Sequence, residues 1–141
     1  MNKVSFTPKM NGIKREWHFI DATDEILGKL STKIAKLLMG KNKAIFTPNE
    51  NVGDKVVVTN AAKVRFTGRK LKDKVYFHHT GYPKGLRSEN LETLFKRRPT
   101  EILIRSVKGM LPKNKLRNLM MKNFYVYPGN ENPHLAQQEN K

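Results

Sequence analysis

The stretch Lys55-Val56-Val57-Val58-Thr59 decides the fold class of this chain of 141 residues. Its three consecutive valines do not alternate with polar residues, so the pattern predicts a strand covered on both faces, as in the parallel sheets of α/β domains. A second strand, ended by an aspartate, is predicted at Trp17–Asp21. Between the two strands, apolar residues recur at helical spacing, namely Leu27, Leu30, Ile34, Leu37 and Leu38. Strand, helix and strand in this order predict a right-handed βαβ unit.

The ends of the predicted helix carry capping signals. Thr23 or Asp24 is the expected N-cap, and Gly40 stands where a glycine often follows a helix. Residues 41–54 are expected to form a loop, and residues 60–65 a short helical turn.

The second half of the chain adds further elements. A loop is predicted at residues 67–70 and a third strand at residues 75–78, leading into a Gly/Pro turn at residues 80–85. Beyond it we expect a helix at 89–95 capped by Ser88, a helix that begins at Pro99, a helix at 113–122 and a last strand at 124–127. Together these elements predict an α/β fold with a mostly parallel, four-stranded sheet.

Length and composition favour one domain over residues 1–141, with an N-terminal arm at 1–14 and a polar C-terminal tail at 128–141. The chain has no cysteine, which excludes disulfides and thiolate chemistry. The first residues lack the apolar core of a secretory signal, and no apolar run is long enough to span a membrane. We therefore expect a cytoplasmic protein.

The charge balance points to a nucleic-acid partner. The chain has 28 Lys and Arg against 12 Asp and Glu, a net charge of +16. Residues 63–122 alone hold 17 basic and 4 acidic side chains, interrupted by apolar residues at structural periods. This pattern is typical of a folded domain with a positive, nucleic-acid-binding face. The alternative is a basic face that only improves solubility, although unneutralised repulsion would destabilise the compact state.

The candidate phosphate-binding cations are Arg69, Lys70, Lys72, Lys74, Lys84, Arg87, Arg97, Arg98, Arg105, Lys108, Lys113, Lys115, Arg117 and Lys122. Tyr82, in the Gly/Pro turn, is a candidate for stacking on an unpaired base or a ribose. The alternative for Tyr82 is a ring packed over its own turn. His78 and His79 are adjacent on a predicted strand and point to opposite faces, which argues against a shared metal ion.

Enzymatic equipment is sparse in this sequence. The chain lacks the phosphate-binding, dinucleotide-binding and nucleophile-elbow glycine motifs. Asp21, facing Asp54 before the next strand, is the only arrangement that resembles a catalytic pair, and such residues more often cap helices or pair with lysines. We therefore expect no catalysis, metal, cofactor or small-molecule substrate.

Two other classes of protein are alternatives to a binding protein. A metal-dependent nuclease would need a carboxylate cluster. A peripheral membrane protein would need an exposed apolar helix face, but the apolar stripes here are required for the core.

Seven motifs carry a resemblance to a known family, and they lie in order between Trp17 and Gln138. They are Trp17–Ala22, Gly28–Leu30, Gly53–Ala61, Thr67–Lys70, His79–Pro83, Val107–Asn114 and Pro133–Gln137. In this order and spacing the chain resembles the ribosomal protein L13 family of the large subunit. Three positions depart from the family pattern: Lys84 and Arg117 stand where glycine is usual, and Asn132 where histidine is usual.

The resemblance implies a three-layer α/β/α fold around a four-stranded parallel sheet. It also implies binding to large-subunit (23S-type) rRNA, early entry into subunit assembly, neighbouring large-subunit proteins as further partners, location on the cytoplasmic ribosome and no catalysis. Carried over by position, the expected RNA contacts are Arg69, Lys70, His79, Tyr82, Lys108, Lys113 and Asn114.

Overall fold

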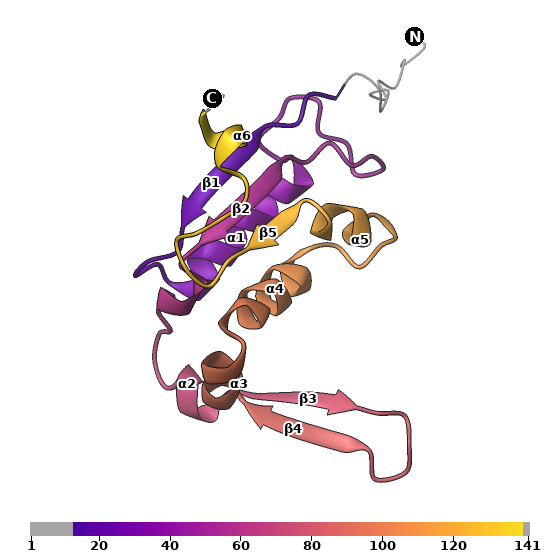
Figure 1. Cartoon of the computed structure of the whole chain (residues 1–141). Helices are drawn as coiled ribbons and strands as arrows, with labels where there is room; N and C mark the ends of the chain where they lie inside the picture. The colour runs from indigo at the N-terminus through magenta and orange to yellow at the C-terminus, as the bar shows by residue number, and fades with distance from the viewer. Residues whose placement is uncertain (1–12, 140–141) are drawn as a thin grey trace.

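A computed structural model describes residues 13–139 of the chain, and its centre is a sheet of three parallel strands in the order β1-β2-β5 (Figure 1). The strands are β1 (Trp17–Asp21), β2 (Lys55–Thr59) and β5 (Phe124–Val126). Val57 of the middle strand lies between Phe19 and Tyr125 in the register. The three valines of β2 are fully buried, so the prediction of a strand covered on both faces is confirmed.

Helices cover one face of this sheet. They are α1 (Leu27–Met39), α4 (Pro99–Met110) and α5 (Leu116–Met121). Val56 and Val58 of β2 share a buried cluster with Ile34 of α1, Leu103 of α4 and Met120 of α5. Burying such side chains stabilises the fold by roughly 1.5–3 kcal/mol each. The alternation of side chains along β2 explains why Val57 is absent from this cluster and points to the opposite face.

The C-terminal segment covers the second face. It contains a short helix, α6 (Leu135–Glu139), which contacts β1. Just before it, the His134 ring packs 5.1 Å from the Trp17 ring and 4.6 Å from the Tyr125 ring, measured between centroids. Its Nε2 atom lies 3.1 Å from the Tyr127 hydroxyl. The segment predicted only as a polar tail is therefore a part of the folded structure up to residue 139.

The four-stranded parallel sheet was a wrong prediction for the described residues. β3 (Val75–His79) does not join the sheet but pairs antiparallel with β4 (Leu86–Asn90), Val75 opposite Asn90 and His79 opposite Leu86. The Gly/Pro turn at 80–85 reverses the chain and makes a hairpin, which projects from the body (Figure 1). Ser88 therefore lies in a strand and caps no helix.

Two short helices flank the hairpin. α3 (Leu91–Arg97) starts directly after β4, two residues later than the helix that was predicted at 89–95. α2 (Lys70–Asp73) begins at the last residue of the loop predicted at 67–70 and ends before the strand predicted at 75–78, where no helix was predicted. A single 3₁₀ turn, Ala61–Lys63, matches the helical turn predicted at 60–65.

The predicted ends of α1 are right at one terminus and wrong at the other. Gly40 has φ 75° and donates its N–H to the Leu37 carbonyl, as a C-terminal glycine should. The helix begins only at Leu27, with Ile26 at the N-cap position, so neither Thr23 nor Asp24 caps it. Thr23 instead directs its hydroxyl to the Asp21 carboxylate at 2.7 Å, and Asp24 has a left-handed backbone with φ 57°. Pro99 is the first residue of α4, as predicted. Most of the expected N-terminal arm, residues 1–12, lies outside the described residues.

Candidate nucleic-acid interface

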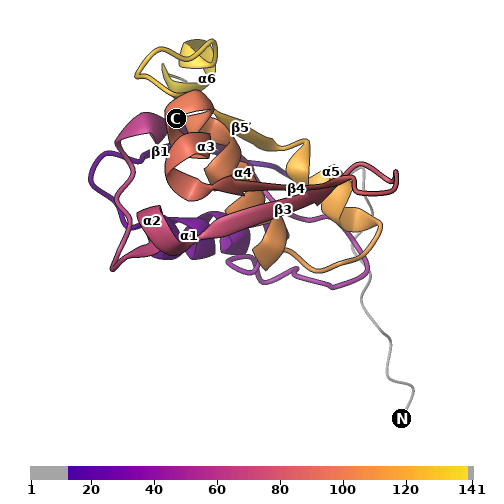
Figure 2. The ribbon, with the colours of Figure 1, turned by 90° about the horizontal axis from the view of Figure 1, so that it is seen from below.

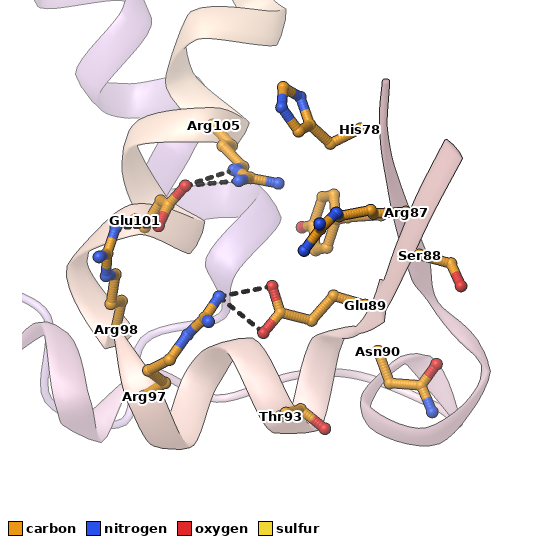
Figure 3. A pocket seen from close by; sticks show the side chains of 11 residues that line it. His78, Arg87, Ser88, Glu89, Asn90, Thr93, Arg97, Arg98, Glu101 and Arg105 are labelled. Atoms are coloured by element: carbon orange, nitrogen blue, oxygen red, sulfur yellow. Dashed lines mark hydrogen bonds and ion pairs between the residues drawn. The ribbon is translucent and has the colours of Figure 1, made fainter. Parts of the chain in front are cut away.

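A cleft of about 640 Å³ lies between the hairpin and the two helices that follow it. One wall is the inner face of the hairpin, where alternation places Tyr76, His78, Arg87 and Glu89 on the same side of the two strands. The other wall comes from α3 and α4 and carries Thr93, Arg97, Arg98, Glu101 and Arg105. Figure 3 shows these side chains around the cleft. Four arginines thus face two glutamates in one hollow.

The two glutamates hold three of these arginines in place. The Nη2 atom of Arg97 lies 2.8 Å from both carboxylate oxygens of Glu89, an ion pair that links α3 to the hairpin. Arg105 donates from Nε and Nη2 to Oε1 of Glu101, while Arg98 lies 3.7 Å from the other oxygen of Glu101. Because one carboxylate is shared by two guanidinium groups, the cleft keeps a surplus of positive charge.

Two cations lie over the Tyr76 ring. The guanidinium carbon of Arg105 and the Nζ atom of Lys74 each lie 5.2 Å from the ring centroid, within the range of cation–π attraction. Tyr76 is half-buried, since it packs against the small core cluster of Leu91, Leu94 and Ile102. This packing couples the cleft to the interior of the protein.

The hairpin tip carries three of the predicted contact residues. Tyr82 is 76% exposed, so its ring is not packed over its own turn. Lys84 has φ 61°, a left-handed conformation that glycine adopts at lower cost. His79 accepts the Gly81 N–H at Nδ1, 2.9 Å away, which orders the turn. The tip therefore presents an aromatic ring, an imidazole and an ammonium group to the surroundings.

The remaining predicted residues form two further groups. Arg69, Lys70 and Lys74 surround a shallow hollow on α2, and Lys72 is exposed on the same helix. Lys113, Asn114, Lys115, Arg117 and Lys122 lie on the loop before α5, on α5 itself and directly after it, with Lys108 near the end of α4. The hairpin and α5 extend to the same side of the molecule in both ribbon views (Figures 1 and 2). All of the predicted contact residues are exposed except Arg105 and Arg117, which are half-buried.

His78, Tyr76, Glu89 and Glu101 also line the cleft, although the sequence did not predict them as residues of this site. Finding the first three required the hairpin, because only strand pairing brings residues 76, 78, 87 and 89 onto one face. Glu101 did carry a signal, since a glutamate four residues before an arginine on a helix favours an ion pair.

The carboxylate pair that was considered for catalysis does not exist. Asp21 ends β1 whereas Asp54 precedes β2, and the parallel register places them at opposite ends of the sheet. Hydrogen bonds from Asn60 and Thr23 lower the pKa of Asp21.

Among residues 13–139, no group of three or more His, Asp or Glu side chains is placed to hold a metal ion. In the same part of the chain, every helix is too short or too polar to cross a bilayer.

Asp54 has a structural environment instead. It is completely buried, where it meets Nε2 of His18 at 3.0 Å, the Glu16 N–H at 3.0 Å and the Lys43 ammonium. Burial by itself raises the pKa of Asp54, but the hydrogen bonds from Lys43, Glu16 and His18 outweigh it and leave the pKa below its ordinary value. Asp54 therefore joins the loop at 41–54 to the start of the sheet.

The fold and this surface define a small, strongly basic α/β protein whose cations gather on the hairpin, on α2 and around α5. The family model of ribosomal protein L13 matches residues 15–133. The chain belongs to the ribosomal protein L13 family, so it is a ribosomal protein and not an enzyme, and its place is the ribosome in the cytoplasm.

Relatives from several bacteria share about half of their residues with this chain. The large ribosomal subunit protein uL13 of Legionella pneumophila (strain Corby) is 50% identical over 134 residues, which cover 95% of this chain and 93% of the relative. The protein of the same name from Geobacter sulfurreducens is 47% identical over 136 residues, covering 96% and 95%. That from Solibacter usitatus is 51% identical over 131 residues, covering 93% and 92%.

Proposed function

We propose that this protein is a structural component of the large ribosomal subunit, in which it binds large-subunit rRNA and supports early assembly. The whole chain, residues 1–141, acts as one domain, with neighbouring large-subunit proteins as further partners. Family membership supports the place on the ribosome, and the charged surface supports RNA as the ligand.

The arginine-lined cleft carries this proposal. Arginine side chains offer planar forks of N–H donors that match phosphate oxygens, and the cleft gathers four of them from the hairpin, α3 and α4. The groups on α2, on the hairpin tip and around α5 extend the contact beyond the cleft. Since side chains cannot enter the deep groove of an A-form helix, these contacts read the shape of the RNA more than its sequence.

Salt dependence of binding tests the proposal directly. The probe is deproteinised large-subunit rRNA, titrated with the full chain at several salt concentrations. If about eight cations neutralise phosphates, the logarithm of the affinity falls against the logarithm of salt with a slope of about −6 to −7. Binding that is absent, or insensitive to salt, would overturn the proposal.

A pair of charge-reversal variants locates the contact. The double variant Arg97→Glu, Arg98→Glu should weaken rRNA binding at least about tenfold, because two cations are replaced by two anions. The matched control is Lys29→Glu, Lys33→Glu, which makes the same charge change on the exposed surface of α1, outside the cleft. Equal losses in the two variants would mean that net charge alone governs binding. Circular dichroism of both variants reports whether the fold is intact.

A further inference from the structure

One carboxylate of the cleft occupies a position that a simple phosphate-binding surface would avoid. Glu101 lies in the first turn of α4 among Arg98, Arg105 and the other cleft cations. A carboxylate beside bound phosphates repels them, so its presence weakens RNA binding unless it does something else. Stabilising the start of α4 is one such role, because acidic side chains there interact favourably with the helix dipole.

The geometry of Arg105 suggests a second role for Glu101. Two of the three guanidinium nitrogens of Arg105, Nε and Nη2, bind the same oxygen of Glu101 at 3.0 and 2.5 Å. The guanidinium group also lies over the Tyr76 ring. Held from one edge and one face, Arg105 directs its third nitrogen away from Glu101 and toward the hairpin (Figure 3).

Arg87 completes the arrangement from the opposite wall. Its side chain extends from β4 into the cleft, on the wall opposite Arg105 (Figure 3), and among the described residues it has no ion pair with a carboxylate. The guanidinium groups of Arg87 and Arg105 line the same cleft and repel each other, and an anion bound between its two walls relieves the repulsion. A phosphate group has the charge and the acceptor oxygens for this position.

We propose that Glu101 is a positioning residue for RNA binding, which fixes Arg105 against Tyr76 so that Arg105 and Arg87 together hold a backbone phosphate. The inference rests on the proposed function and deepens it, since it assigns a phosphate site to two arginines and an orienting role to an acidic residue. Fixing the guanidinium group before the RNA arrives reduces the entropy that binding must remove.

The sign of one substitution separates positioning from simple repulsion. Glu101→Gln removes a negative charge from the cleft, so Coulomb's law alone makes rRNA binding tighter. If Glu101 orients Arg105, the same variant binds about threefold to tenfold more weakly, because a neutral amide oxygen holds the guanidinium group less firmly than a carboxylate does. The matched control is Glu92→Gln on α3, where an exposed glutamate pairs with Lys96 at 2.8 Å outside the cleft. This control should bind as tightly as the wild type or slightly tighter.

A double-mutant cycle shows whether Glu101 acts through Arg105. Arg105→Gln removes the phosphate contact and should weaken binding about tenfold, with a salt slope shallower by about one contact. In the Arg105→Gln background, the further change Glu101→Gln should cost no additional affinity, because the group that it orients is gone. A helix-stabilising role alone would leave the loss the same in both backgrounds.

The outcomes distinguish this inference from the function on which it rests. Wild-type protein that fails to bind rRNA overturns the proposed function. Two results would overturn the positioning role only, provided that the wild type binds rRNA. In the first, Glu101→Gln binds rRNA more tightly than the wild type. In the second, Glu101→Gln lowers rRNA affinity by the same factor in the wild-type and the Arg105→Gln backgrounds. Thermal unfolding of each variant is measured in parallel. If Glu101→Gln unfolds, Glu101→Asp is used instead, which keeps the charge but shortens the reach to Arg105 and should weaken binding for the same reason.

Discussion

At the scale of single residues, Asp54 shows how a buried charge is kept in this fold. The carboxylate is removed from water and is compensated by His18, Lys43 and a backbone N–H. Removing one partner of such a buried ion pair lowers stability more than replacing the whole pair with apolar residues, because the remaining charge stays buried without compensation. Asp54 is therefore a residue of the framework, although its position next to a sheet strand suggested chemistry at first.

The variant Asp54→Asn should lower the free energy of unfolding by about 3 kcal/mol at pH 7. Because the folded pKa of Asp54 is lowered, its contribution is fully present above the unfolded pKa of about 4 and is lost as the pH falls through the folded value. The difference between wild type and variant should therefore shrink toward pH 3. Chemical denaturation at pH 7 and at pH 3 measures this. Asp73→Asn, on the exposed surface of α2, is the control and should change stability little at either pH.

Lys84 is a second residue whose place in the fold lowers stability, in this case through backbone strain. A lysine at φ 61° is strained by about 1 kcal/mol, and glycine relieves that strain. Lys84→Gly should therefore leave stability unchanged or raise it by up to about 1 kcal/mol, while rRNA affinity falls and the salt slope loses about one contact. Lys84→Asn tolerates the same backbone without the charge and should bind as weakly. Unchanged rRNA affinity in both variants would remove Lys84 from the contact surface.

At the scale of elements, the end of α1 and the start of β2 approach each other closely. A Cβ atom on Gly53 would lie 1.8 Å from the Leu38 carbonyl oxygen, so only glycine fits between the loop and the helix. The close approach also allows the Asp54 N–H to bond to the Leu37 carbonyl at 3.1 Å. Gly53 therefore sets the distance between the first helix and the central strand.

Gly53→Ala should destabilise the protein by about 3 kcal/mol, since backbone on both sides must move. Gly109 in α4 offers a control of opposite sign, because a Cβ there meets nothing within 4 Å. Gly109→Ala should stabilise the protein by up to about 1 kcal/mol through helix propensity. Thermal unfolding of the two variants tests both signs, and a Gly53→Ala variant as stable as wild type would contradict the close approach.

The elements also show where sequence reasoning succeeds and where it fails. The βαβ unit was predictable because the valine run and the helical stripe each carry a strong period, and Gly40 and Pro99 mark helix ends by backbone chemistry. The strand at Leu86–Asn90 was not predictable, since its residues are mostly polar and Ser88 with Glu89 imitates a helix start. Strand pairing, a tertiary effect, outweighed that local preference. Missing the strand also hid the inner face of the cleft.

At the scale of the whole molecule, the two faces of the sheet differ in what covers them. Long helices bury one face, whereas the C-terminal segment closes the other through an aromatic cluster around His134. The cationic residues were predictable as a set from the excess of charge over residues 63–122. Which of them meet was not predictable, because Arg87, Arg97 and Arg105 come together only when the hairpin folds against α3 and α4.

The single tryptophan of the chain provides a test of this closure. Trp17 lies under His134, so His134→Ala should shift its fluorescence emission to longer wavelength and lower stability by about 1 kcal/mol. Affinity for rRNA should not change, since the cluster lies on the face away from the helices and the cleft. His79→Ala, at the hairpin tip, is the control and should leave the emission unchanged. An unshifted His134→Ala spectrum would mean that the segment does not seal this face.

The projecting hairpin offers a way to monitor subunit assembly by limited proteolysis. The peptide bond after Lys84 lies in an exposed turn that stands clear of the body, where a trypsin-like protease can reach it. If the hairpin binds RNA or a neighbouring protein in the large subunit, as proposed, that contact shields this bond. The rate at which the protease cleaves the chain there would then fall as the hairpin becomes covered during assembly.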